Sequence, residues 1–226
     1  MSAPAESPGD PPPAAPAALS YRGLGFLVSL RWLVLGAALY ALLLLVAVAG
    51  NPTDEIVPFI GPNFYLTPAF GLPLVVATFR QPGRMRRAVY FLLLVPLAHM
   101  GAIYLAWSFG LQHIGAFPRG ELELVSGAIG GLSGAAFAFA GFSLTRLGAR
   151  RRAELATMIV AALLLAAAGA ADMVAGLGLT GALREDSYPS PAQLIIWFEC
   201  VHLPWQLLFA LVLAWLMRSR RSATSH

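Results

Sequence analysis

Residues Gly130 to Phe142 read GGLSGAAFAFAGF, a run of small and aromatic side chains with one serine, Ser133. The run lies inside a longer segment, 122–145, in which no charged residue follows Glu123. A helix of about 20 apolar residues crosses the hydrocarbon core of a bilayer. The segment therefore predicts a transmembrane helix, and its small residues predict close packing against neighbouring helices.

Other parts of the chain have the same length and apolar character. The six predicted spans are 26–50, 58–79, 87–110, 122–145, 155–178 and 191–217. A composition of 58% hydrophobic and 12% charged residues is typical of an integral membrane protein. We therefore expect an all-α, six-helix membrane domain over residues 22–218. A disordered tail rich in proline and alanine at 1–21 and a basic tail at 219–226 are expected to flank it.

The arginines indicate how the spans are oriented. All 15 basic residues are arginine, and all except Arg119 and Arg184 lie beside the same ends of the predicted helices. The positive-inside rule makes that side cytoplasmic, so both termini are expected there. Arginine without lysine indicates a GC-rich genome, and we expect a prokaryotic plasma membrane. The bilayer, rather than a nucleic acid, accounts for the basic residues.

Polar side chains inside a membrane are costly and are therefore candidate functional residues. The candidates are His99, Asp172, Glu199, His202 and Ser133. Ser133 and His202 each lie about eleven residues from the outer end of their span, which places both roughly 16 Å deep. A hydroxyl beside an imidazole can act as a nucleophile with its base. A serine among glycines, however, more often packs and bonds to its own helix backbone.

This pattern resembles the rhomboid family of intramembrane proteases. The resemblance rests on Gly131, Ser133, Gly134 and Gly141 in one span and on His202 in the last. It implies a serine endopeptidase without metal or cofactor, in which Ser133 attacks the peptide and His202 acts as the base. It also implies that the substrates are single-span or polytopic membrane proteins, cut near the outer end of a helix.

Four more residues are assigned supporting roles within this interpretation. Asn63 and Thr67 share a helix face if the second span is helical there, and an asparagine amide could complete an oxyanion hole begun by the Ser133 backbone N–H. Asn63 could instead simply cap a helix. Asp172 resembles a similarly placed aspartate of some bacterial rhomboids. Glu199, one turn before His202, is expected to orient the imidazole or to face the outer aqueous cavity.

Three alternatives stay open. A catalytically inactive rhomboid-like protein would bind membrane helices, and it is indicated by Trp205 and Phe209, which stand where the family carries glycines. His99 lies at the depth of His202, and two such histidines can bind haem b. Glu199 and His202 form a Glu-x-x-His pair, as in di-metal helix bundles, although those sites need the pair twice.

Overall fold

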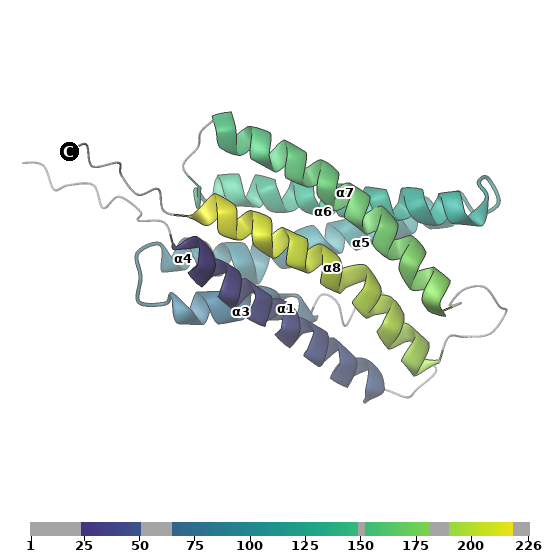
Figure 1. Cartoon of the computed structure of the whole chain (residues 1–226), viewed down its shortest axis with the longest axis horizontal. Helices are drawn as coiled ribbons and strands as arrows, with labels where there is room; N and C mark the ends of the chain where they lie inside the picture. Colours follow the sequence, from purple (N-terminus) through teal and green to yellow (C-terminus); the bar gives the residue numbers. More distant parts are fainter. Residues whose placement is uncertain (1–23, 51–64, 149–151, 181–189, 219–226) are drawn as a thin grey trace, which may run out of the picture.

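The computed structural model describes residues 24–50, 65–148, 152–180 and 190–218, and these fold almost entirely into helices (Figure 1). No β-strand occurs in these four segments, where one isolated bridge pairs Leu24 with Arg218. The prediction of an all-α protein is confirmed for the described residues.

Five helices are long and apolar enough to cross a membrane. Four of them are α1 (Phe26–Ala49), α6 (Arg119–Leu144), α7 (Arg152–Thr180) and α8 (Pro191–Met217). The fifth is continuous and consists of α4 (Arg84–Val89), a π-helical turn (Tyr90–Leu94) and α5 (Val95–Gln112). Large apolar side chains such as Leu35, Leu163 and Trp215 are exposed on their outer surfaces. Such surfaces suit contact with lipid, which is as apolar as the side chains themselves.

The start of α8 shows how local sequence sets a helix boundary. The hydroxyl of Ser190 accepts a hydrogen bond from the Gln193 backbone N–H at 3.3 Å, and the Gln193 side chain accepts one from the Ser190 N–H at 2.8 Å. This capping box satisfies backbone donors that the first helical turn leaves without partners. Pro191 follows as the first helical residue, where its missing N–H costs nothing.

The predicted span 58–79 is only partly helical in the described residues. Tyr65 and Leu66 are helical, and α3 (Pro68–Ala77) follows, whose ten residues are too few by themselves to cross a bilayer. Residues 58–64 lie outside the described part of the chain. The described residues therefore contain five helices long enough to cross a membrane and one short apolar helix, so the sixth predicted span is not confirmed.

A buried arginine closes the turn between α3 and α4. The Arg87 side chain is 1% exposed and donates hydrogen bonds to the carbonyls of Thr78 at 2.9 Å, Gln81 at 3.2 Å and Pro82 at 2.9 Å. These carbonyls end or follow α3, where the helix dipole favours positive charge. Arg87 therefore fixes the chain path as well as contributing to the charge asymmetry.

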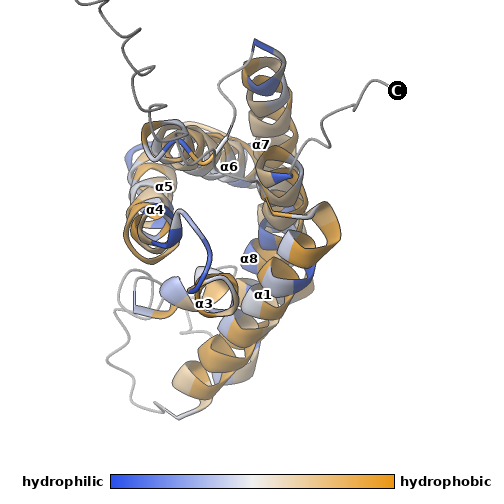
Figure 2. Ribbon diagram, turned by 90° about the vertical axis from the view of Figure 1, so that its left-hand side faces the viewer, coloured by the Kyte–Doolittle hydropathy of each residue, from blue (hydrophilic) through white to orange (hydrophobic). Residues whose placement is uncertain are grey.

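The helices form a ring when viewed along the bundle (Figure 2). In order around the ring, α8 packs against α1, α1 against α3, α3 against the π-helical turn before α5, α5 against α6, α6 against α7, and α7 against α8. Phe70, Phe139 and Phe209, from α3, α6 and α8, fill the interior, with Phe209 5.9 Å between ring centres from each of the other two. In this order around the ring, the neighbours of α6 are α5 and α7, whereas α8 lies between α7 and α1.

Glycines on α6 allow its neighbours to approach closely. A Cβ atom on Gly131 would overlap the Leu165 backbone carbonyl of α7, and one on Gly141 would press against the Leu94 side chain. The two glycines thus face different neighbours, α7 and the π-helical turn. Close packing on more than one side explains why small residues recur along this helix.

Candidate functional site

Ser133 lies half-buried on α6, with its hydroxyl bonded to its own helix. The hydroxyl donates to the Ile129 carbonyl at 2.6 Å and has a longer contact of 3.3 Å with the Gly130 carbonyl. A serine in a membrane helix commonly makes this bond to the carbonyl four residues earlier. The Ser133 hydroxyl therefore has its hydrogen-bond partner within its own helix, and not at a histidine that could act as its base.

His202 lies on α8 among aromatic rings. Its ring centre is 5.0 Å from that of His99, 6.1 Å from that of Tyr40 and 6.0 Å from that of Phe198. Phe198 is stacked on the imidazole at 12°, whereas His99 and Tyr40 meet it edge to face. Within the described residues, the structure brings His202 against His99 and Tyr40, and no hydrogen bond joins it to Ser133.

Trp205 occupies the space between the Ser133 helix and the His202 helix. A Cβ atom on Gly134 would lie 3.5 Å from the Trp205 indole, so the ring reaches α6 directly beside Ser133. The indole also packs on Phe209, with ring centres 5.0 Å apart. Aromatic rings fill this part of the bundle and hold α8 away from the backbone of α6.

His99 and Tyr40 complete a cluster drawn from three helices. His99 is on α5 and Tyr40, 1% exposed, is on α1, with their ring centres 6.4 Å apart. The Nε2 atom of His99 is buried and has no hydrogen-bond partner in the described part of the chain. We refer to His99, His202 and Tyr40 as the histidine cluster.

Tyr40 was not predicted from the sequence. A signal was present, because Tyr40 is the only residue with a polar group in the apolar run from Leu33 to Ala49. A buried tyrosine usually carries its hydroxyl toward a polar partner, so a lone tyrosine at this depth marks a polar interior.

The two carboxylates predicted to support the site lie on different helices. Glu199 is half-buried on α8, one turn before His202. Asp172 is on α7, and its Oδ2 atom is buried without a partner in the described segments. Acidic groups from α7 and α8 thus add to the polar character of the interior.

The predicted oxyanion residues are only partly described. Thr67 is 2% exposed at the start of α3, where its carbonyl accepts a hydrogen bond from the Phe70 N–H at 3.1 Å. Asn63 lies outside the described residues. Thr67 therefore sits at a helix start, and the role of Asn63 stays a prediction.

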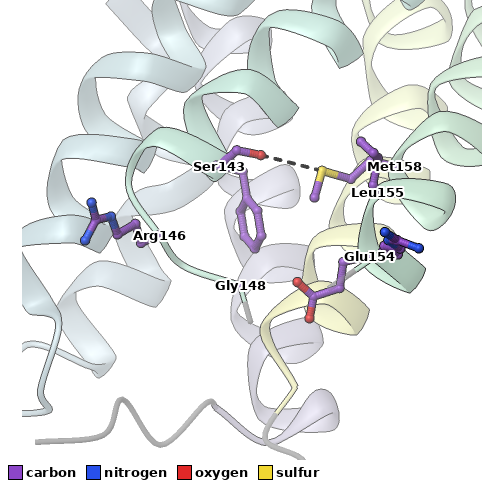
Figure 3. A pocket seen from close by; sticks show the side chains of 8 residues that line it. Ser143, Arg146, Gly148, Glu154, Leu155 and Met158 are labelled. Carbon is purple, nitrogen blue, oxygen red and sulfur yellow. Dashed lines mark hydrogen bonds between the residues drawn. The ribbon is translucent and has the colours of Figure 1, made fainter. Parts of the chain in front are cut away.

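A separate pocket of about 280 Å³ lies between the end of α6 and the start of α7 (Figure 3). Its lining includes Phe142, Arg146, Arg152, Glu154 and Met158. In Figure 3 the Glu154 carboxylate projects toward Gly148, while Arg146 lies on the other side of that loop. The pocket combines an apolar wall with charges of both signs.

The α6 helix ends at this pocket in an unusual way. Arg146 adopts a left-handed conformation with φ of 55°. The Leu147 N–H bonds to the Phe142 carbonyl at 3.4 Å, and the Arg146 N–H bonds to the Ser143 carbonyl at 3.2 Å. These two bonds form a Schellman motif, in which glycine is the usual left-handed residue. An arginine at this position costs about 1–2 kcal/mol relative to the right-handed conformation.

Comparison with known proteins adds no assignment: no protein-family model matches the chain, and neither a curated protein nor a solved structure matches it. The candidate functions are therefore argued from the geometry of the described residues and from the sequence pattern.

Proposed function

We propose that this chain is an integral membrane protein that binds a divalent transition-metal ion, such as Zn²⁺, between His99 and His202. The observation that carries the proposal is the contact of the two imidazoles, from α5 and α8, with ring centres 5.0 Å apart. Neutral imidazole is a preferred ligand of zinc, copper and nickel. Metal binding gives two histidines a reason to face each other inside an apolar bundle.

The separation of the rings suits a single ion better than a haem. With Zn–N bonds of about 2.0–2.1 Å and tetrahedral angles, two imidazoles on one ion have ring centres roughly 5 Å apart. Imidazoles on opposite faces of a haem iron have ring centres more than about 6 Å apart, with the porphyrin between them. The observed 5.0 Å therefore favours an ion held directly between the rings.

The burial of His99 supports the same proposal. Its Nε2 atom has no hydrogen-bond partner among the described residues, and leaving such an atom buried costs about 1–3 kcal/mol. A metal bond to this nitrogen would remove the cost. No group of three His, Cys, Asp or Glu side chains could hold a metal in the described ranges, so water or an external ligand takes the other positions. Two protein ligands make the binding weak and exchangeable, unlike a closed structural site.

The test uses Zn²⁺ and Co²⁺ on the purified protein. Zn²⁺ at a hundred times its dissociation constant is expected to stabilise the fold by about 2.7 kcal/mol. Co²⁺ is expected to give the visible absorption of a tetrahedral site. His99→Ala and His202→Ala should each remove both responses. His113→Ala is the matched control, since His113 lies at the end of α5 against Phe109.

Two results would overturn the proposal. If His99→Ala and His202→Ala respond to Zn²⁺ as the unaltered protein does, the metal binds elsewhere or not at all. A Soret band in the protein as purified would assign the pair to haem b instead.

A second candidate is a rhomboid-like serine protease with Ser133 as nucleophile and His202 as base, in a six-span bundle of a prokaryotic plasma membrane. The observation that favours it is the sequence pattern of Gly131, Ser133 and Gly134 on α6 with His202 on α8. The Trp205 indole, which lies against Gly134, would have to move aside for His202 to reach Ser133. Catalysis requires the Ser133 hydroxyl to leave the Ile129 carbonyl and His202 to turn from His99. Both changes are side-chain rotations, and that of His202 would break its stacking on Phe198.

A fluorophosphonate probe tests this candidate without a known substrate. Labelling of the unaltered protein and of Ser143→Ala, but not of Ser133→Ala, is the expected result for the protease. Ser143 is the matched control, because it is on the same helix and its hydroxyl also bonds to a carbonyl four residues earlier. If the folded protein is not labelled, the protease candidate is rejected in favour of the catalytically inactive rhomboid-like alternative. The metal proposal is unaffected by that result.

A further inference from the structure

We infer that the pocket between the end of α6 and the start of α7 binds the headgroup of an anionic phospholipid, of the phosphatidylglycerol class. Arg146 and Arg152 line it together with the apolar side chains of Phe142, Leu155 and Met158. Basic pockets between transmembrane helices are suited to phosphate-bearing headgroups. The inference is independent of the metal and protease proposals.

The position of the pocket along the helices suits a lipid headgroup. It lies where α6 ends and α7 begins, so it is at the membrane boundary of two helices that are long enough to cross (Figure 3). The predicted orientation makes this boundary cytoplasmic. Leu144, 76% exposed, and Ile159, 55% exposed, continue the apolar surface from the pocket along the helices. Acyl chains could follow that surface while the phosphate stays beside the arginines.

The carboxylate in the pocket favours a headgroup that carries hydroxyl groups. Glu154, two residues after Arg152, also lines the pocket. A bare phosphate would be repelled by this carboxylate, whereas the glycerol hydroxyls of phosphatidylglycerol can donate hydrogen bonds to it. A carboxylate has two oxygens and several lone pairs, so it can accept such bonds in addition to those it already makes.

The conformation of Arg146 is consistent with a binding role. A glycine would adopt its φ of 55° without strain, and would complete the same Schellman motif. In Figure 3 the guanidinium of this exposed arginine points away from Glu154, and a side-chain rotation, which is fast for exposed residues, would bring it to the rim of the pocket. The side chain, rather than the backbone geometry, is therefore what distinguishes this residue from the usual glycine.

Arg146→Gly tests the inference because it moves two measurements in opposite directions. In lipid-free detergent it should raise the melting temperature, since it relieves the left-handed strain. In nanodiscs it should weaken retention of phosphatidylglycerol about fivefold, measured by native mass spectrometry. Arg152→Gln should weaken retention similarly, and Glu154→Gln should reduce the preference for phosphatidylglycerol over phosphatidic acid. Arg80→Gln, an exposed arginine outside the pocket, is the matched control.

The remaining arms separate the possible ligands. Phosphatidylglycerol should stabilise the unaltered protein, while phosphatidylcholine and free glycerol 3-phosphate should not. Equal stabilisation by free glycerol 3-phosphate would replace the lipid with a soluble phosphate. If Arg146→Gly and Arg152→Gln retain phosphatidylglycerol as Arg80→Gln does, the pocket is not a lipid site.

Discussion

The imidazole of His99 meets that of His202 across the interior of the helix ring, with ring centres 5.0 Å apart. These residues belong to α5 and α8, which are not neighbours around the ring. Tyr40 reaches both imidazoles from α1. Three helices therefore direct polar groups to one point in a bundle whose interior is mostly aromatic and aliphatic, and this requires an explanation beyond packing.

Replacing His99 with leucine should separate stability from metal binding. Because His99 Nε2 has no partner in the described residues, an apolar side chain of similar size removes an unpaired polar atom from the interior. We expect His99→Leu to leave the melting temperature of the metal-free protein unchanged or raised, and to abolish its increase with Zn²⁺. Thermal unfolding in detergent with a chelator or with Zn²⁺ measures both effects. A large loss of stability without metal would show that the imidazole is held by the fold itself.

The contact between α6 and α7 should not tolerate even a methyl group at Gly131. A Cβ atom there would overlap the Leu165 carbonyl, and backbone atoms cannot move aside as a side chain can. We expect Gly131→Ala to destabilise the protein by about 1–3 kcal/mol. Gly178→Ala is the control, because no atom lies within 4 Å of the added Cβ and alanine favours a helix by about 1 kcal/mol. Equal melting temperatures for the two variants would argue against this close approach.

Most helix positions could be predicted from the sequence, because length and hydropathy determine which segments can cross a bilayer. The span 191–217 coincides with α8, where Ser190 and Pro191 mark the helix start. Of the span 58–79, the described residues contain α3 (Pro68–Ala77) and two helical residues before it, Tyr65 and Leu66, so the full length of this span stays a prediction. Hydropathy does not distinguish a full crossing from a short helix preceded by an apolar, proline-rich segment.

The candidate site was harder to predict, because its geometry depends on the order of helices around the ring. Depth along each helix placed His99, His202 and Ser133 at one level, but depth does not say which of them meet. The contacts of His202 with His99 and Tyr40 depend on α1 packing beside α8 and on α6 packing away from it. Periodicity within single helices carries no information about that arrangement.

Arg87 should be essential for the turn between α3 and α4. Its guanidinium is 1% exposed and donates to three carbonyls, which would be left without these donors in Arg87→Met. Since a hydrogen bond from a charged group is worth about 1.5–3 kcal/mol, we expect a loss of at least about 3 kcal/mol. Arg86→Met, at the exposed neighbouring position, should change stability by less than about 0.5 kcal/mol. Similar chemical-denaturation midpoints for the two variants would contradict the structural role of Arg87.

The last prediction concerns the orientation of the chain in the membrane. Arginines beside one set of helix ends predict cytoplasmic termini and an external segment around residues 184–190. In a Cys200→Ser background, a membrane-impermeant maleimide applied to intact cells should modify Ser187→Cys. It should modify Ser222→Cys only after the membrane is opened. Both positions lie outside the described residues, so the labelling tests the charge rule rather than the fold. The reverse pattern would place Arg146 and Arg152 on the outer side, where the lipid proposal would have to be tested against the outer leaflet.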